Sequence, residues 1–322
     1  MAGMAQAQPN IALVKYWGKQ PGLDNIPATP SLSITLDSLW TRTRVEFSES
    51  CRQDRLTING ETDRAQQQRA SRWLDDFRRT TGSTLYADVQ SKNNFPTGAG
   101  LASSASGFAA LVTAACAALN LNPSSEDRCR LARRGSASAA RSIPGGFVEM
   151  DITDRNPAAY CVLDESDWPL QVLVVVTSTA QKQTGSTEGM VRSAATSDFY
   201  NSWTSSARVD FSTGRQAVLE RDFQKLADVS EASCLKMHGV MLSTKPALVY
   251  WNGTTVETIH CVRELRSQGM PVFFTIDAGP QVKVVTLPGH SDELKRAIAT
   301  IPGVIEIIPS ALGAGARIID KF

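Results

Sequence analysis

Long apolar runs are absent from this 322-residue sequence, and so is an excess of charge of either sign. One of the strongest apolar runs, Leu170 to Val176, is interrupted by Gln171, so we expect no segment that spans a membrane. Lys and Arg number 33 against 32 Asp and Glu, which lacks the basic excess of a general nucleic-acid binder. The first ten residues show neither the basic segment nor the apolar core of a secretory signal, and we therefore expect a cytoplasmic protein.

Cysteine and histidine are also sparse. The six cysteines form no CxxC pair, and the three histidines do not cluster with them. This spacing lacks the pattern of a disulfide framework or a zinc site, so we expect scattered free thiols. What is present is an ordinary globular composition, 42% hydrophobic and 20% charged, in a chain long enough for two domains.

The first half of the chain mixes strand and helix patterns. Leu32, Ile34 and Leu36 alternate with polar residues, which predicts a half-buried strand. Ala70, Trp73 and Phe77 recur at helical spacing on an otherwise charged segment, which predicts an amphipathic helix. Further strands are expected at 11–14, 43–47, 86–89 and 147–150, and helices at 63–79, 103–119 and 127–134.

The second half is richer in helical patterns. Helices are expected at 186–195, 215–227, 229–242, 256–267 and 292–300, and strands at 172–177, 272–276, 282–286 and 304–308. Helices and strands in this uneven order favour an α+β fold over a regular βαβ winding. We place a domain boundary near Pro169, with an N-terminal domain over 1–172 and a C-terminal domain over 173–322.

A glycine-rich segment at 94–106, NFPTGAGLASSAS, lies between a predicted strand and a predicted buried helix. Gly98 and Gly100 let the backbone approach a ligand closely, and Ser103 and Ser104 can cap the free N–H groups of the helix. Such a helix start binds anions, and phosphate is the natural ligand. The segment matches neither the Walker A motif nor GxGxxG. Taken alone, a tight turn with a serine cap explains it equally well.

The longer string PTGAGLASSA, at 96–105, resembles the phosphate-binding motif of the GHMP kinases. Within that superfamily the chain is similar to the diphosphomevalonate decarboxylases. Four more segments carry the resemblance, namely NIALVKYWGK at 10–19, GSASAARS and GGFVE within 135–149, TGSTEGM at 184–190 and FTIDAGP at 274–280. Five motifs in the same order make the resemblance specific.

The resemblance implies a two-domain GHMP kinase fold, with an N-terminal domain like ribosomal protein S5 domain 2 and a ferredoxin-like C-terminal domain. It implies that ATP phosphorylates the 3-hydroxyl of mevalonate 5-diphosphate, after which phosphate and CO2 leave and isopentenyl diphosphate forms. Mg²⁺ is expected because phosphoryl transfer from ATP is nearly always metal-assisted. No carboxylate cage is evident, so we expect the ion to be held mainly by the ATP phosphates. A homodimer is expected by analogy with the family.

Three residues are expected to be catalytic. Asp277 follows an apolar strand and precedes small residues, and a carboxylate there can accept or orient the hydroxyl proton. Lys15 would keep Asp277 ionised and neutralise phosphoryl charge, and Arg141 would hold the substrate carboxylate with its planar fork. Without the resemblance, a turn-capping aspartate, a solvated lysine and a surface arginine describe the same positions.

The remaining site residues follow from the family motifs. The resemblance implies substrate contacts from Tyr16, Lys19, Ser136, Ser138 and Ser186. It implies ATP contacts from Ser103, Ser104, Gly98 and Gly100, and we add Asn93 and Asn94 because they precede the loop. Many bacterial relatives carry an arginine after the serine equivalent to Ser186, whereas this chain has Thr187. The contact with the substrate diphosphate at Thr187 is therefore expected to differ from that in those relatives.

Three alternative functions share these motifs. The chain could decarboxylate mevalonate 5-phosphate, or phosphorylate mevalonate at its 3-hydroxyl without decarboxylation. An alternative of another class is a catalytically inactive binding relative. The joint presence of Lys15, Arg141 and Asp277 argues against that last alternative.

Overall fold

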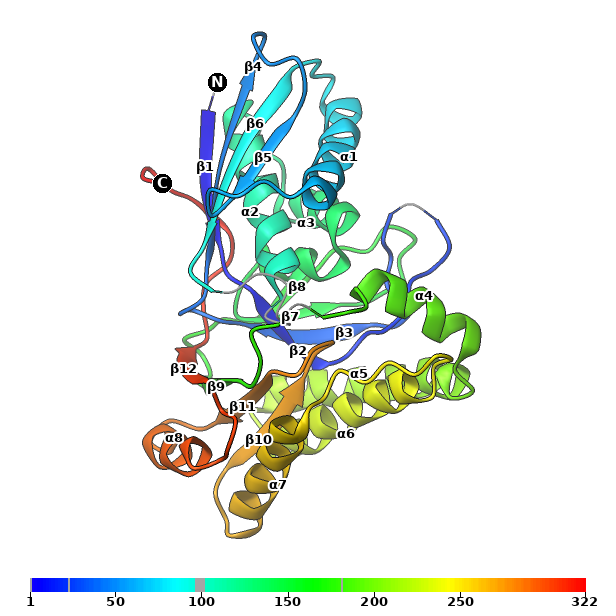
Figure 1. Ribbon diagram of the computed structural model, residues 1–322, viewed down its shortest axis with the longest axis vertical. Coiled ribbons are helices and arrows are strands. Elements are labelled where there is room, and N and C mark those ends of the chain that lie inside the picture. The colour runs from blue at the N-terminus through cyan, green and yellow to red at the C-terminus, as the bar shows by residue number, and fades with distance from the viewer. Residues whose placement is uncertain (1, 23, 96–101, 181) are drawn as a thin grey trace.

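The computed structural model describes residues 2–22, 24–95, 102–180 and 182–322. Its strands form three sheets, one above the other in Figure 1, with helices packed against them. The first sheet has the order β13-β1-β4-β6-β5, and only its β5–β6 pair is parallel. Its strands are β1 (Ala2–Ala7), β4 (Thr41–Ser48), β5 (Arg55–Ile58), β6 (Tyr86–Asn93) and β13 (Arg317–Ile318). The alternating burial along β4 shows that one of its faces packs on the core.

The other two sheets are antiparallel. The second consists of β2 (Asn10–Val14), β3 (Ser31–Thr35), β7 (Phe147–Met150) and β8 (Tyr160–Leu163). The third consists of β10 (Val272–Ile276), β11 (Val282–Thr286), β9 (Gln171–Val176) and β12 (Glu306–Ala311). Every residue of β2, β3, β10 and β11 is buried, because both faces of these strands are covered.

Two helices cover the first sheet. In α1 (Arg64–Thr81), the Asp63 side chain accepts a hydrogen bond from the Gln66 backbone N–H at 2.8 Å, which caps the helix start. The apolar helix α2 (Ser103–Ala118) packs on β1, where Gly3 permits the contact: a Cβ at Gly3 would lie 2.3 Å from the Ala114 carbonyl oxygen. This close contact holds the C-terminal part of α2 against the sheet, and the N-terminus of the same helix lies beside the pocket described below.

The remaining helices are α3 (Ser125–Gly135), the 3-10 helix η1 (Ala137–Ser142), α4 (Ser186–Thr196), α5 (Tyr200–Glu220), α6 (Phe223–Leu242), α7 (Gly253–Ser267) and α8 (Ser291–Ala299). The prediction of separate helices at 215–227 and 229–242 was wrong in its boundary. The break falls at Arg221, whose φ of 55° is left-handed, and the side chain of Asp222 then caps α6. The apolar pattern continues across this break, so periodicity alone did not reveal it.

The two halves of the chain share part of their core. Ile11 and Leu13 of β2 belong to the same buried cluster as Val172 and Val174 of β9 and Phe211 of α5. The C-terminal segment then returns to the first sheet, where β13 pairs with β1 (Figure 1). The predicted α+β class is confirmed. No helix in the described part of the chain is long and apolar enough to cross a membrane.

Candidate functional site

Two strand ends meet at the floor of the site. Lys15 follows β2 and Asp277 follows β10, and the Thr275 hydroxyl joins these strands by donating to the Ala12 carbonyl at 3.0 Å. The Lys15 Nζ lies 2.6 Å from the Asp277 Oδ1, and the lysine side chain is 1% exposed whereas the aspartate is 24% exposed. The structure thus places together two residues from opposite ends of the sequence, with the carboxylate accessible from a pocket.

A second lysine lies on the other side of the Asp277 carboxylate. The Lys283 Nζ is 3.5 Å from the Asp277 Oδ2. Burial alone would raise the pKa of Asp277, but the charges of Lys15 and Lys283 outweigh it and hold the pKa well below its ordinary value. Asp277 is therefore a carboxylate throughout the physiological pH range and a weak base.

Arg141 lies at the end of η1 with its guanidinium buried and held in place. Its Nη1 donates to the Ser31 hydroxyl at 2.9 Å and its Nη2 donates to the Asn10 Oδ1 at 3.2 Å. The guanidinium carbon lies 5.3 Å from the centre of the Tyr16 ring, and Nε has no hydrogen-bond partner among the described residues. This rigid placement, with a donor unused, suits an arginine that receives an anionic ligand group.

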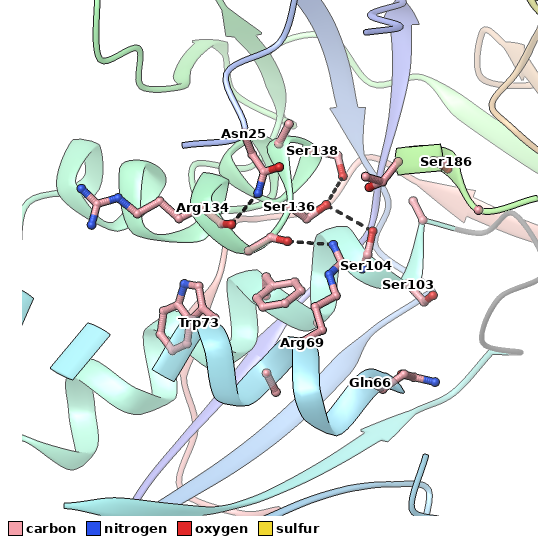
Figure 2. A pocket seen from close by; sticks show the side chains of 18 of the residues that line it. Asn25, Gln66, Arg69, Trp73, Ser103, Ser104, Arg134, Ser136, Ser138 and Ser186 are labelled. Carbon is pink, nitrogen blue, oxygen red and sulfur yellow. Dashed lines mark hydrogen bonds between the residues drawn. The ribbon is translucent and has the colours of Figure 1, made fainter. Parts of the chain in front are cut away.

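A row of serines joins the start of α2 to the segment before η1. Ser104 and Ser136 have their hydroxyl oxygens 3.3 Å apart, and the oxygens of Ser136 and Ser138 are 3.2 Å apart, as Figure 2 shows. Ser103 lies beside Ser104 in the first turn of α2. Hydroxyls and a helix N-terminus on one wall supply hydrogen bonds and a positive field for phosphate oxygens.

Lys19 and Tyr16, which follow β2, also line the site. The Lys19 Nζ donates to the Asn25 Oδ1 at 2.7 Å and to the Thr187 hydroxyl at 3.3 Å. Asn25 in turn donates to the Arg134 carbonyl, which ties the loop after β2 to α3 (Figure 2). Burial raises the pKa of Tyr16, so its hydroxyl remains protonated and able to donate.

Lys182 and Ser186 close the site from the C-terminal half. The Lys182 Nζ donates to the Ser186 hydroxyl at 2.8 Å and to the Ala278 carbonyl at 3.1 Å. Burial lowers the pKa of Lys182 to about 8, against a partial opposing effect of Asp277. Ser186 is the first residue of α4, so the N-terminus of that helix also faces the site.

Most of these side chains, though not Lys283, line one pocket of about 1410 Å³. The predicted residues on its wall are Lys15, Tyr16, Lys19, Asn93, Ser103, Ser104, Ser136, Ser138, Arg141, Ser186 and Asp277. Asn94 does not line it, because its side chain binds the Trp40 N–H at 2.7 Å and the Ser38 carbonyl at 2.8 Å. Gly98 and Gly100 lie outside the described residues.

Three basic residues of the site were not predicted from the sequence. Lys283 stands alone among apolar residues in β11, and a lone charge inside a buried strand is the signal that could have identified it. Lys182 comes four residues before Ser186 in the TGSTEGM region. Arg69 of α1 donates to the Gly135 carbonyl at 2.7 Å and points into the pocket in Figure 2, but it is one of many arginines on a charged helix face.

The side chains around the pocket determine how a metal ion could be held there. Among the described residues, no three His, Cys, Asp or Glu side chains lie close enough to hold a metal. The pocket wall offers hydroxyls and cations. Its carboxylates Asp24, Asp76 and Glu188 each pair with an arginine, and Asp277 already faces two lysines. Mg²⁺ fits such a site when phosphate oxygens supply most of its ligands, with the Ser103 and Ser104 hydroxyls as protein oxygens on the same wall.

Comparison with known proteins places the whole chain. Residues 7–161 match the model of the diphosphomevalonate decarboxylase-like N-terminal domain, and residues 172–310 match that of the mevalonate 5-diphosphate decarboxylase C-terminal domain. The chain is 34% identical to the diphosphomevalonate decarboxylase of Candida albicans, over 97% of this chain and 96% of that protein.

Solved structures agree over the full length. A structure described as "Mevalonate diphosphate mediated ATP binding mechanism of the mevalonate diphosphate decarboxylase from Enterococcus faecalis" is 36% identical, with a TM-score of 0.90 over 100% of this chain and 99% of that chain. Another, described as "MDDEF in complex with MVAPP, AMPPCP and Magnesium", is 37% identical, with a TM-score of 0.92 over the same shares of the two chains. The predicted two-domain α+β architecture of the GHMP kinase type is thereby confirmed, and the chain belongs to the diphosphomevalonate decarboxylase family.

Proposed function

We propose that this protein uses ATP to phosphorylate the 3-hydroxyl of mevalonate 5-diphosphate, and then releases phosphate and CO2 to form isopentenyl diphosphate. The observation that carries the proposal is the Lys15–Asp277 contact of 2.6 Å in a pocket also lined by Arg141. Family membership supplies the substrates, since relatives were solved with mevalonate diphosphate, an ATP analogue and magnesium. The enzyme is thus an ATP- and Mg²⁺-dependent decarboxylase of the mevalonate pathway.

The substrate would lie between the two halves of the chain. Asp277 can accept a hydrogen bond from the 3-hydroxyl, which aims the oxygen at the γ-phosphate. The carboxylate is a weak base, so its main contribution is to orient the hydroxyl rather than to keep its proton. Lys15, bound to the same carboxylate, carries a positive charge toward the reacting phosphoryl group.

Arg141 would hold the carboxylate that later leaves as CO2. Its guanidinium is fixed by Ser31 and Asn10 before any ligand binds, so little ordering is required on binding. The diphosphate would lie among Tyr16, Lys19 and the hydroxyls of Ser138 and Ser186. The substrate would then keep one orientation while the new 3-phosphate departs and CO2 is lost.

The nucleotide would lie along the α2 side of the pocket. Ser103 and Ser104 would hydrogen-bond its phosphates at the helix N-terminus, with Ser136 behind them. The pocket continues past Asn93 to the apolar side chains of Leu56, Ile58 and Val89, a surface suited to a planar base. When bound, Mg²⁺ would offset the charge of the ATP phosphates.

Three further statements about the chain remain predictions. We expect a domain boundary near residue 172, close to the start of β9, with the C-terminal residues returning to the first sheet. We expect a homodimer, which light scattering would test. We expect a cytoplasmic location, which fractionation would test.

The experiment that tests the function uses three candidate substrates. The protein is incubated with ATP, Mg²⁺ and either mevalonate, its 5-phosphate or its 5-diphosphate, and ADP and CO2 are measured separately. We expect ADP and CO2 in equal amounts with the 5-diphosphate alone. ADP without CO2 from mevalonate would indicate a 3-kinase, and turnover restricted to the 5-phosphate would indicate the monophosphate decarboxylase.

A further inference from the structure

The Asp277 carboxylate is flanked by two buried lysines rather than one. Lys15 reaches Oδ1 at 2.6 Å, and Lys283 reaches toward Oδ2 at 3.5 Å. Both lysine side chains are nearly excluded from solvent, at 1% and 2% exposure. A lysine in such a place costs free energy unless it is paired, so the position requires a partner, and Asp277 is the carboxylate that it faces.

The strand register explains how Lys283 reaches this point. Lys283 of β11 pairs directly with Thr275 of β10, so their side chains share one face of the sheet. Asp277 follows two residues after Thr275 and so continues on that face. The neighbours Val282 and Val284 point to the opposite face, into the cluster formed with α7 and α8. A one-residue shift of β11 would bury a valine against Asp277 and move the charge away.

Lys283 does not line the pocket, in contrast to Lys15, Arg141 and Lys182. It therefore acts on the reaction through Asp277 and not through a ligand. We propose that Lys283 is a positioning residue, which fixes the second oxygen of Asp277 so that the carboxylate stays ionised and correctly oriented for the substrate hydroxyl. This rests on the proposed function for its kinetic consequences, but the state of Asp277 itself can be measured without turnover.

The titratable and charged groups near Asp277 determine how the pH dependence of kcat is interpreted. They are Lys15, Tyr16, Arg141, Lys182, Cys234, His238 and Lys283. Burial lowers the pKa of His238 to about 3 and raises that of Cys234 to about 11, so both stay neutral between pH 5 and 9. Lys182, with a pKa of about 8, titrates only on the alkaline side. An acid-side change that appears when Lys283 is removed is therefore assigned to Asp277.

The sign of the effect follows directly. Lys283 lowers the pKa of Asp277, so its replacement by a neutral residue raises that pKa, and the inactive protonated form grows as the pH falls. An opposite charge at this distance shifts a carboxyl pKa by about one to three units. For Lys283→Met we expect the acid limb of kcat to move upward by about one to two units, with KM for both substrates nearly unchanged because Lys283 touches neither.

The test measures kcat and KM for the wild type, Lys283→Met and Lys283→Arg from the lowest pH at which all three stay folded up to pH 9. The range must extend into strong acid, because the pKa of Asp277 in the wild type lies well below its ordinary value. Lys236→Met is the matched control, because Lys236 pairs with Asp210 at 2.8 Å in a partly exposed position outside the pocket. We expect Lys283→Arg and the control to keep the wild-type acid limb. An unchanged acid limb in Lys283→Met, or a uniform loss at every pH with raised KM, would overturn the proposal.

A second measurement does not depend on activity. The carboxyl carbon of Asp277 is followed by NMR during an acid titration of the unliganded protein, with Asp277→Asn used to assign the signal. We expect a higher pKa in Lys283→Met than in the wild type, and an equal pKa would overturn the proposal. If Lys283→Met does not fold, Lys283→Gln replaces it. An inactive wild type would contradict the proposed function alone, since the titration would still report on Lys283.

Discussion

Lys15 and Asp277 are 262 positions apart in the sequence, yet the Lys15 Nζ lies 2.6 Å from the Asp277 Oδ1. Each residue directly follows a fully buried strand, β2 in one half of the chain and β10 in the other. The contact therefore exists only when the two halves are packed together. It explains why neither half could carry out the proposed reaction by itself.

Replacement of Arg141 should affect both substrate binding and turnover. Its guanidinium would contact a carboxylate present in both the ground state and the transition state, so Arg141→Ala should raise KM and lower kcat. Loss of a charged hydrogen bond of about 1.5–3 kcal/mol corresponds to about 10- to 100-fold in kcat/KM. Arg141→Lys should not fully restore activity, because lysine lacks the planar fork held by Ser31 and Asn10.

Steady-state kinetics with mevalonate 5-diphosphate would check this prediction. Arg130→Ala is a suitable control, since Arg130 pairs with Asp127 at 2.9 Å on the surface of α3. Full activity in Arg141→Lys would show that charge alone suffices at this position.

Ser104 tests which ligand lies at the start of α2. Ser104→Ala removes a hydroxyl beside Ser136 at the helix N-terminus and should weaken ATP binding or slow turnover by about tenfold, the value of one hydrogen bond to a charged group. Calorimetric titration with a non-hydrolysable ATP analogue measures the effect, and Ser205→Ala on the exposed face of α5 is the control. Weaker binding of mevalonate 5-diphosphate alone would reverse the assignment of this wall.

Protonation of Lys182 should make the affinity for anionic ligands depend on pH on the alkaline side. Burial lowers its pKa to about 8, so its protonated fraction falls from about nine-tenths at pH 7 to about one-tenth at pH 9. Affinity for anionic ligands should therefore weaken as the pH rises through about 8. In Lys182→Met this change should be absent, and the affinity of the variant for anionic ligands should be low at both pH 7 and pH 9. Isothermal titrations at pH 7 and 9 decide the matter, and an identical pH dependence in both proteins would exclude Lys182 as its source.

Asp54 supports the fold rather than the site. It accepts two hydrogen bonds from Arg78, at 2.9 and 2.8 Å, and one from the Ala87 N–H at 2.9 Å. Asp54→Ala leaves the buried Ala87 N–H without this acceptor and leaves Arg78 with Asp75 alone, at 2.6 Å, so the free energy of unfolding should fall by about 2–3 kcal/mol.

Urea denaturation followed by circular dichroism measures that change. Glu46→Ala breaks a partly exposed pair with Arg44 and should lower the free energy of unfolding by less than about 1 kcal/mol. Equal effects of the two substitutions would show that burial of the Asp54 pair is unimportant for stability.

Much of this architecture could be predicted from local sequence. The helix α1 has a regular apolar face with Trp73 and Phe77, and the motif-bearing strands β2 and β10 end directly before Lys15 and Asp277. Other elements were missed because their patterns are weak. The strands β1, β5 and β8 are short or contain small residues, and their positions depend on pairing with distant strands.

The site residues likewise divide into those that could be predicted from local sequence and those that could not. Residues inside sequence motifs were predicted, whereas Lys283 and Arg69 enter the site through strand register and helix packing. Asn94 shows the opposite case, since it borders the motif but binds Ser38 and Trp40 instead of lining the pocket. Proximity in the sequence did not distinguish it from Asn93, which does line the pocket.

The central claim is that Asp277, held by Lys15, positions the hydroxyl that attacks ATP. The most direct test measures ADP and CO2 released by Asp277→Ala from mevalonate 5-diphosphate and ATP. We predict a loss in kcat of at least about 10²–10⁴-fold with little change in substrate binding, because the carboxylate acts mainly in the transition state. Near-normal turnover in this variant would contradict the mechanism proposed for the site.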